Sequence, residues 1–351
     1  MGADRECCAR NDLARGTGNV LSSAPAWGGT TSILVGDHIE TQGNADCLQA
    51  TAAMFGWEFG RLTARDAAHG DAVVGPDGTC PVSPAALARG GVTIIALENA
   101  SGAEDLFRFR APDGPIAVVV GNERKGISRQ LLRLADHVVQ IPIASSTVNT
   151  INVAAASAVA LYYLSRGRSG RIGTRADSGS RPEVMLAGAI DAIELGSAVR
   201  TAACFGWTQL FVPDRCSAWF AADRVTRSLG RGAARRARNP IHVLPVRGDE
   251  LFDDVCVVGV QRGGAPLQRT DLAGGPRQLV VIADETAGDI DERDLAHLGH
   301  RVRRVHLDIE HEARRPFRSI ASIVLAEIAR QVGSWRRPIE APRSERRRRS
   351  P

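Results

Sequence analysis

Apolar residues along the chain form short runs that predict buried strands alternating with helices. The clearest run is a group of three valines at residues 118–120, a pattern typical of a strand buried on both faces. A glycine–asparagine pair interrupts it, and a short leucine-bearing helix follows. A second apolar strand is expected at residues 138–143, ended by Pro142, which lacks the N–H that a ladder needs. The alanine-rich stretch that begins at Asn152 predicts a helix able to pack closely against a neighbour.

The remaining elements of the first half continue the alternation. Residues 32–36 and 92–97 read as buried strands, and Asn44 is placed to cap a helix between them. The Gly/Pro-rich stretch at residues 58–91 is hard to assign, apart from a helix at residues 84–89. Strands alternating with helices predict an α/β fold with a mostly parallel sheet covered on both faces.

The second half of the chain repeats the first. The segment TAAMFGW at residues 51–57 returns as TAACFGW at residues 201–207, an offset of 150 residues. Two strands and the final helix are echoed in the same order, which predicts an internal duplication. We expect a poorly ordered N-terminus (1–30), a first domain (31–166), a Gly/Ser/Arg linker (167–182), a second, degenerate copy (183–335) and a basic disordered tail (336–351).

Two polar loops of the first half carry motifs. GNERKGIS at residues 121–128 matches GNExxG(L/I)S, and the pair IPI (141–143) and TINVA (150–154) follows it in order, again at a strand end and before a helix. Together they resemble the SpoU/TrmH branch of the SPOUT class of RNA ribose 2′-O-methyltransferases. The alternative is an ordinary α/β domain with two polar loops.

The resemblance implies tandem SPOUT-type α/β-knot domains, with a deep trefoil knot in the first copy that holds S-adenosyl-L-methionine. It implies a substrate that is rRNA or tRNA, and a methyl transfer that needs no metal, because the sulfonium leaving group drives it. The family positions that contact the cofactor correspond to Leu97, Gly121, Asn122, Ile141, Ile143 and Ile151.

The family's first motif, N-x-G-x-x-x-R-T-A, is divided between the two halves. The first half has Asn44 at the Asn position but Ala50 at the Arg position, whereas the second half has Arg200 at the Arg position but Glu194 at the Asn position. Family active sites form at a dimer interface, so the chain resembles a dimer made covalent, with one composite site. The implied catalytic residues are Arg200, Asn152, Asn44, Glu123 and Thr150.

Individual motif positions bear on this interpretation. Thr150 stands where the family usually has Ser. Glu123 could orient a substrate hydroxyl or simply cap the following helix. The second copy's cofactor loops are degraded, because Ala283 replaces Gly121 and the segment aligned with residues 150–152 reads Arg-Arg-Pro; Pro142 is expected to correspond to His306. One cofactor pocket is therefore expected in each chain.

Composition and charge restrict the expected cellular location and the residues expected to bind RNA. The 351 residues are 44% hydrophobic with no run long enough to span a bilayer, and no secretory signal is apparent, so the cytoplasm is the expected location. The seven cysteines show no metal or disulfide spacing. The net charge is +5 and Lys125 is the only lysine, so arginine would carry RNA contacts. The expected RNA-binding residues are Arg224, Arg227, Arg231, Arg235, Arg236 and Arg238.

Three functions remain open at this point. The first is an S-adenosylmethionine-dependent RNA 2′-O-methyltransferase whose two halves form an intramolecular pseudo-dimer, with further homodimerisation possible. The second is a catalytically inactive RNA-binding paralogue, suggested by Ala50, Thr150 and the degraded second copy. The third keeps cofactor binding and uses it as a sensor.

Overall fold

The computed structural model describes twelve stretches of the chain: residues 31–62, 79–80, 82–146, 148–165, 181–187, 192–213, 241–245, 252–260, 263–273, 277–283, 297–309 and 314–333. The expected N-terminal segment, most of the linker and the basic tail lie outside these residues. None of the described helices combines the length and the apolar character needed to cross a membrane.

The first half forms a parallel six-stranded sheet with the order β2-β1-β5-β3-β6-β4, which confirms the expected α/β class. Its strands are β1 (Ile33–Asp37), β2 (Glu58–Leu62), β3 (Thr93–Leu97), β4 (Glu104–Asp105), β5 (Ile116–Val120) and β6 (His137–Gln140). Its helices are α1 (Gln42–Met54), α3 (Pro84–Arg89), α4 (Arg129–Leu134) and α5 (Val153–Ser165).

The second half forms a parallel seven-stranded sheet with the order β11-β13-β10-β12-β7-β8-β9. Its strands are β7 (Glu183–Leu186), β8 (Gln209–Val212), β9 (His242–Pro245), β10 (Asp254–Gly259), β11 (Ala265–Pro266), β12 (Gln278–Ile282) and β13 (Val302–His306). Its helices are α6 (Ala192–Cys204), the 3-10 turn η2 (Leu267–Arg269) and α9 (Phe317–Val332).

The two sheets share one strand order when it is read from opposite ends. With β7, β8, β10, β11, β12 and β13 taken in chain order as the counterparts of β1 to β6, each strand has the same neighbours in both sheets. The extra strand β9 lies beside β8, and in the first half a single bridge from Gly60 to Cys80 lies beside β2 in the same way. The halves therefore match in topology as well as in the sequence echoes.

The strand register corrects one expected correspondence. In the first sheet Gln140 pairs with Asp105 of β4, and in the second sheet His306 pairs with Pro266 of β11. His306 is thus the counterpart of Gln140 and not of Pro142. The alignment by motif was wrong here because the strand pairing fixes this register, whereas the loops that precede the strands differ in length.

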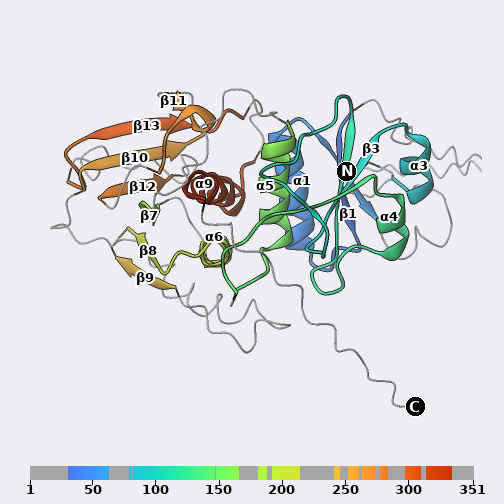
Figure 1. The fold of residues 1–351 in the computed structure, drawn as a ribbon, viewed down its shortest axis with the longest axis horizontal. Helices are drawn as coiled ribbons and strands as arrows, with labels where there is room; N and C mark the ends of the chain where they lie inside the picture. The colour runs from blue at the N-terminus through green and yellow to red at the C-terminus, as the bar shows by residue number, and fades with distance from the viewer. Residues whose placement is uncertain are drawn as a thin grey trace, which may run out of the picture.

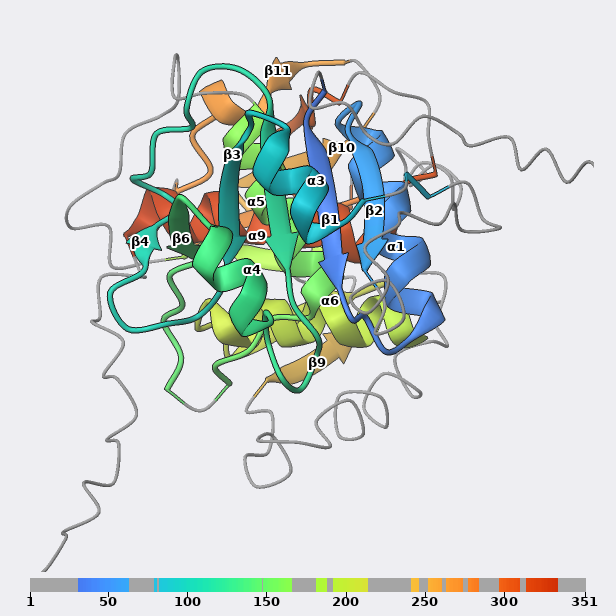
Figure 2. The same ribbon diagram turned by 90° about the vertical axis from the view of Figure 1, so that its right-hand side faces the viewer.

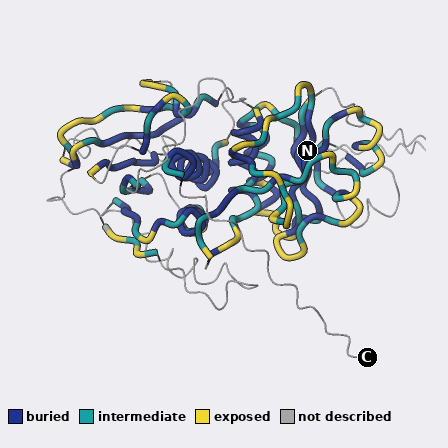
Figure 3. The backbone as a smooth tube through the Cα atoms, viewed as in Figure 1, coloured by how far each residue is buried: buried dark blue, intermediate teal, exposed yellow. Residues whose placement is uncertain are grey.

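Four helices fill the space between the two sheets (Figure 1). Helix α5 packs against α1 and α9, and α6 packs against α9. Alternate residues of each sheet face this layer, and one continuous apolar core crosses from the first half to the second through it. Most residues of the helices in this layer are buried (Figure 3).

The opposite faces of the sheets form separate, smaller cores. In the first half α3 and α4 cover the outer face (Figure 2), where Leu87 and Leu131 pack with alternate residues of β1, β3 and β5. In the second half a third cluster includes Met185 and Phe211. Each sheet therefore has one face toward the helices shared by both halves and one face of its own.

Several element boundaries differ from those expected. The strand predicted at residues 138–143 ends at Gln140, before the Ile-Pro pair. Helix α1 begins at Gln42, and its N-cap is Thr41, whose hydroxyl accepts from the Asn44 N–H at 3.4 Å; Asn44 lies within the first turn and is not the cap. Strand β2 was not predicted, because EFGRL has little apolar periodicity. The trefoil knot stays a prediction.

A buried polar group lies where α5 and α9 cross. The Tyr163 hydroxyl donates to a Glu327 carboxylate oxygen at 2.6 Å, and Glu327 also accepts from Arg330 and Gln331 on its own helix, at 2.6–3.0 Å. Glu327 is fully buried, so these partners satisfy a charge that would otherwise be costly. When α5 and α9 are aligned from their first residues, Tyr163 and Glu327 occupy the same position.

Candidate active site between the halves

The candidate site lies at the carboxyl edge of the first sheet, where β1, β3, β5 and β6 end and where α1 and α5 begin. In parallel α/β sheets ligands bind at this edge, because the loops that follow the strands meet there. The two motif loops, at residues 121–128 and 141–152, both leave the sheet at this edge.

Backbone geometry fixes the loop after β5. A Cβ at Gly121 would lie 2.2 Å from the Gly126 carbonyl carbon and 2.3 Å from the Ile127 nitrogen, so only glycine fits there. Gly126 itself has φ +69°. Asn122 and Gly126 exchange both backbone hydrogen bonds, at 2.9 and 3.0 Å. The loop therefore closes on itself.

The side chain of Asn122 serves this loop. Its amide oxygen accepts from the N–H groups of Arg124 and Lys125 at 2.9 and 3.0 Å, and its NH₂ donates to the His38 carbonyl at 2.7 Å and to Glu40 at 3.3 Å. The residue is buried. Its contacts stabilise the loop conformation rather than presenting a side-chain amide to a ligand.

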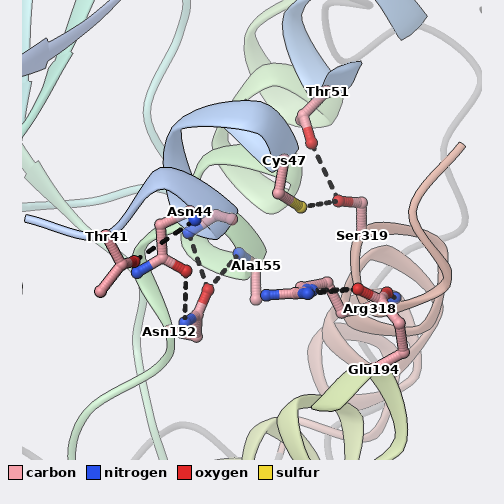
Figure 4. Close-up of polar contacts among 10 residues, drawn as sticks. Thr41, Asn44, Cys47, Thr51, Asn152, Ala155, Glu194, Arg318 and Ser319 are labelled. Atoms are coloured by element: carbon pink, nitrogen blue, oxygen red, sulfur yellow. Dashed lines mark hydrogen bonds and ion pairs between the residues drawn. The ribbon is translucent and has the colours of Figure 1, made fainter. Parts of the chain in front are cut away.

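Glu123, Asn44 and Asn152 form a chain of hydrogen bonds. The Asn44 NH₂ donates to the Glu123 carboxylate at 2.6 Å. The Asn152 NH₂ in turn donates to the Asn44 amide oxygen at 3.2 Å, a contact shown in Figure 4. Glu123 also accepts from the Glu40 N–H at 3.0 Å and from the Thr41 hydroxyl at 3.3 Å. Three of the predicted catalytic residues are thus joined directly.

The Glu123 carboxylate is held ionised by its partners. Partial burial raises its pKa, but the hydrogen bonds from Asn44 and from nearby backbone N–H groups outweigh burial, and the net pKa lies below its ordinary value. Glu123 does not cap α4, which leaves the alternative sequence interpretation unsupported. A carboxylate without its proton can accept hydrogen bonds and orient a hydroxyl, but it cannot act as an acid near neutral pH.

Asn152 has a second, structural task. Its side-chain oxygen accepts from the N–H groups of Ala154 and Ala155, at 2.9 and 3.4 Å, and so satisfies two of the donors that the first turn of α5 leaves unpaired. With the oxygen committed to the helix, its NH₂ points to Asn44. The cap therefore fixes the orientation of the amide in the site.

Arg200 reaches this site from the second half. Its Nε donates to the Thr150 carbonyl at 2.7 Å, and an Nη donates to the Thr150 hydroxyl. Burial lowers the pKa of Arg200, while Cys204 acts in the opposite sense. Thr150 itself is exposed. The guanidinium thus contacts the second motif loop at Thr150, which lies two positions before Asn152 in the sequence.

The predicted cofactor residues divide by burial. Leu97, Ile141 and Ile151 pack against the main core yet keep exposed apolar surface at the strand ends. These positions, with the glycine backbone at Gly121, fit the apolar and backbone contacts that an adenosyl group needs. Ile143 is buried within the core. The roles of all these residues stay predictions.

The corresponding place in the second half holds an ion pair. Glu194, in the first turn of α6, accepts from the backbone N–H of Arg318 at 2.8 Å and from its Nε at 2.6 Å, and an Nη donates as well (Figure 4). Both side chains are nearly buried. The second half thus has an ion pair between α6 and α9 where the first half has the Asn44–Asn152 amide contact between α1 and α5.

Some participants were not apparent from the sequence. Asp37 accepts from the Ser128 N–H at 2.6 Å and Glu98 accepts from the Ile127 N–H at 2.9 Å, so two carboxylates hold the end of the first loop. Cys204 contacts the second loop. Both carboxylates stand at or directly after the ends of buried strands, which is a usable signal. The arginines expected to bind RNA, residues 224–238, lie outside the described residues.

Comparison with known families agrees with the motif loops. Residues 82–162 match the model of the SpoU rRNA Methylase family. An uncharacterised tRNA/rRNA methyltransferase of Mycobacterium sp. (strain KMS) is 30% identical over 163 residues, which cover 43% of this chain and 51% of that protein. A protein of the same description from Mycolicibacterium paratuberculosis is 36% identical over 80 residues, which cover 23% of this chain and 25% of that protein. The chain spans about half the length of the first of these relatives.

Solved structures of lower identity are also similar. The A. aeolicus TrmH/SpoU tRNA modifying enzyme is 19% identical with a TM-score of 0.33, over 40% of this chain and 76% of that one. The SpoU methyltransferase AviRb from Streptomyces viridochromogenes, crystallised with AdoMet, is 19% identical with a TM-score of 0.32, over 42% of this chain and 60% of that one. Residues 82–162, which include both motif loops, are therefore similar in sequence to the SpoU rRNA Methylase family.

Proposed function

We propose that this protein is an S-adenosylmethionine-dependent RNA methyltransferase that methylates a ribose 2′-hydroxyl of rRNA or tRNA. We further propose that the halves are two copies of one SPOUT-type fold, knotted in the first copy, which share a single active site. The observation that carries the proposal is the pair of hydrogen bonds from Arg200 in the second half to Thr150 in the first, beside the Asn152–Asn44–Glu123 chain.

Each residue has a chemical task in this proposal. S-adenosylmethionine supplies, when bound, an electrophilic methyl group. The Arg200 guanidinium stabilises the negative charge that develops on the attacking 2′-oxygen and binds the adjacent phosphate. Asn44, Asn152 and the ionised Glu123 orient the ribose. The 2′-oxygen gains the methyl group, and its proton leaves to water or to a phosphate oxygen, because arginine keeps its own proton.

The apolar positions at the strand ends support the cofactor assignment. Leu97, Ile141 and Ile151 offer partly exposed apolar surface, and the closed loop at Gly121 offers backbone groups. In the second half the corresponding region carries the Glu194–Arg318 ion pair, and charged groups do not suit an adenine ring. One cofactor for each chain follows from this asymmetry.

The test is methyl transfer from labelled S-adenosylmethionine to total RNA, followed by mapping of the modified nucleotide. A ribose 2′-O-methyl group makes the neighbouring linkage resistant to alkali, because the attacking hydroxyl is blocked. Label in an alkali-resistant dinucleotide supports the proposal. Label in a base, or no transfer from any RNA pool, contradicts it.

A second candidate is an RNA-binding protein without catalysis. The observation that favours it is Ala50, which leaves the first half without the family arginine and makes Arg200 the sole substitute among the motif positions. This candidate predicts RNA binding with neither methyl transfer nor cofactor affinity. Equilibrium binding of labelled S-adenosylmethionine separates it from the first proposal, and also from a cofactor sensor, which would bind the cofactor without transferring it.

A further inference from the structure

The last turn of α6, in the second half, contacts the loop at residues 144–150, in the first half. A helix leaves its last four carbonyls without intrahelical partners. In α6 three of them are satisfied locally, at 3.0–3.1 Å, by the N–H groups of residues 205–207. The fourth, the carbonyl of Cys204, accepts instead from the N–H groups of Ala144 and Ser145, at 2.9 and 3.0 Å.

The same residue makes a second contact with its side chain. The Thr150 N–H lowers the pKa of the Cys204 thiol, but burial outweighs it and raises that pKa to about 12, so the thiol keeps its proton. One turn earlier on α6, Arg200 binds the Thr150 carbonyl and hydroxyl. The loop is therefore held at both ends by one helix of the other half: at Ala144 and Ser145 by the Cys204 carbonyl, and at Thr150 by the Arg200 guanidinium.

We propose that the C-terminal turn of α6 is a clamp that holds residues 144–146 and 148–150 in one conformation, with Cys204 as its positioning residue. The consequence for cofactor binding rests on the proposed function, because Ile141 and Ile151 flank this loop. Through the clamp, the half that lacks a cofactor pocket shapes the pocket of the other half. A loop without the clamp would have to lose its conformational freedom when the cofactor binds, which lowers affinity.

Amide hydrogen exchange tests the clamp in the full chain without any cofactor. We expect protected amides at Ala144, Ser145 and Thr150. Cys204→Ala removes the thiol on which the Thr150 N–H acts, and the exchange of this amide should accelerate roughly five- to tenfold, as expected if the thiol accepts a hydrogen bond from it. Cys204→Ser keeps an acceptor and should stay within about twofold of wild type.

Cys256→Ala is the matched control. Cys256 is equally buried in the same half, on β10, and burial raises its pKa to about 12 as well, but within the described part of the chain it forms no hydrogen bond with the loop. It should leave the Thr150 amide unchanged. With S-adenosylmethionine as the probe, Cys204→Ala should raise the dissociation constant roughly five- to tenfold while RNA affinity is unchanged.

The outcomes distinguish the clamp from the proposed function. Rapid exchange of the three amides in the wild-type chain overturns the clamp, whether or not any variant folds. Equal exchange and equal cofactor affinity in Cys204→Ala and Cys256→Ala overturn it too. Protected amides that respond to Cys204→Ala, in a wild-type chain that binds no S-adenosylmethionine, support the clamp and contradict the proposed enzyme.

Discussion

Replacing Arg200 with alanine tests the composite site most directly. The side chain makes two hydrogen bonds to Thr150, which is exposed, so water can replace them and the loss of stability should be about 1 kcal/mol or less. A loss of that size shifts the melting temperature by only about 2–4 °C. In the proposed mechanism the same substitution removes the charge that stabilises the developing oxyanion, and such losses typically lower the rate about 10²–10³-fold.

The assay is single-turnover methyl transfer at saturating cofactor and RNA, with the melting temperature measured on the same samples. Arg301→Ala is the control, because Arg301 lies in the same half, is 75% exposed and forms a surface ion pair with Asp254. We expect the control to keep its rate. A full rate for Arg200→Ala would show that the halves do not share a site and that the second is a scaffold.

Three related substitutions sharpen the result. Arg200→Lys should recover little activity. Arginine donates from Nε to the Thr150 carbonyl and from Nη to the Thr150 hydroxyl, and the single nitrogen of lysine cannot reproduce this forked geometry. Ala50→Arg should not rescue Arg200→Ala, because Ala50 holds the position on α1 that Arg200 holds on α6 and would by symmetry face the second half. Asn152→Ala should also slow transfer, and its combination with Arg200→Ala should cost less than the sum if both act on one transition state.

Three further outcomes are expected. Calorimetry should find one S-adenosylmethionine site for each chain, and two equivalent sites would refute the asymmetry of the halves. Glu194→Ala should destabilise the protein by roughly 3–5 kcal/mol in denaturant unfolding, because it leaves the Arg318 charge nearly buried without its partner; an unchanged midpoint would mean that water reaches Arg318. Alanine at Arg231, Arg235 and Arg236 should weaken RNA binding across sequences and flatten its salt dependence; unchanged affinity and slope would leave these arginines as a solvated surface.

Sequence reasoning named the residues of the candidate site but could not supply their contacts. Residues of the motif loops, such as Glu123 and Asn152, could be named from the sequence because the glycines, amides and helix start that form such a loop are close together in the chain. The partners of Glu123 lie 79 to 83 residues away, at Asn44, Thr41 and Glu40. Such contacts depend on how two strands lie side by side, which no local pattern records.

The fold shows the same division. Buried strands of branched residues, such as residues 116–120, were clear from their apolar runs, whereas β2 was missed because its glycine and its charged residues are tolerated near the sheet edge. His306 was assigned to the wrong counterpart because motif spacing changes with loop length, whereas pairing between strands does not. The printed sequence could not mark the carbonyl of Cys204 as a contact to the loop, because every residue has a carbonyl, and the role proposed for its thiol depends on the position of Thr150 in the other half.

The Tyr163–Glu327 contact has a consequence for the history of the proposed duplication. In a symmetric dimer of identical chains, a residue on the twofold axis contacts its own copy, so the two side chains in that contact must be of the same residue type. Once both copies lie in one chain, each can mutate alone, and a phenol can meet a carboxylate. The change also works against return: a second half paired with itself would bring two buried glutamates together. Joining the halves thus freed this position from symmetry and then made the joined state hard to undo.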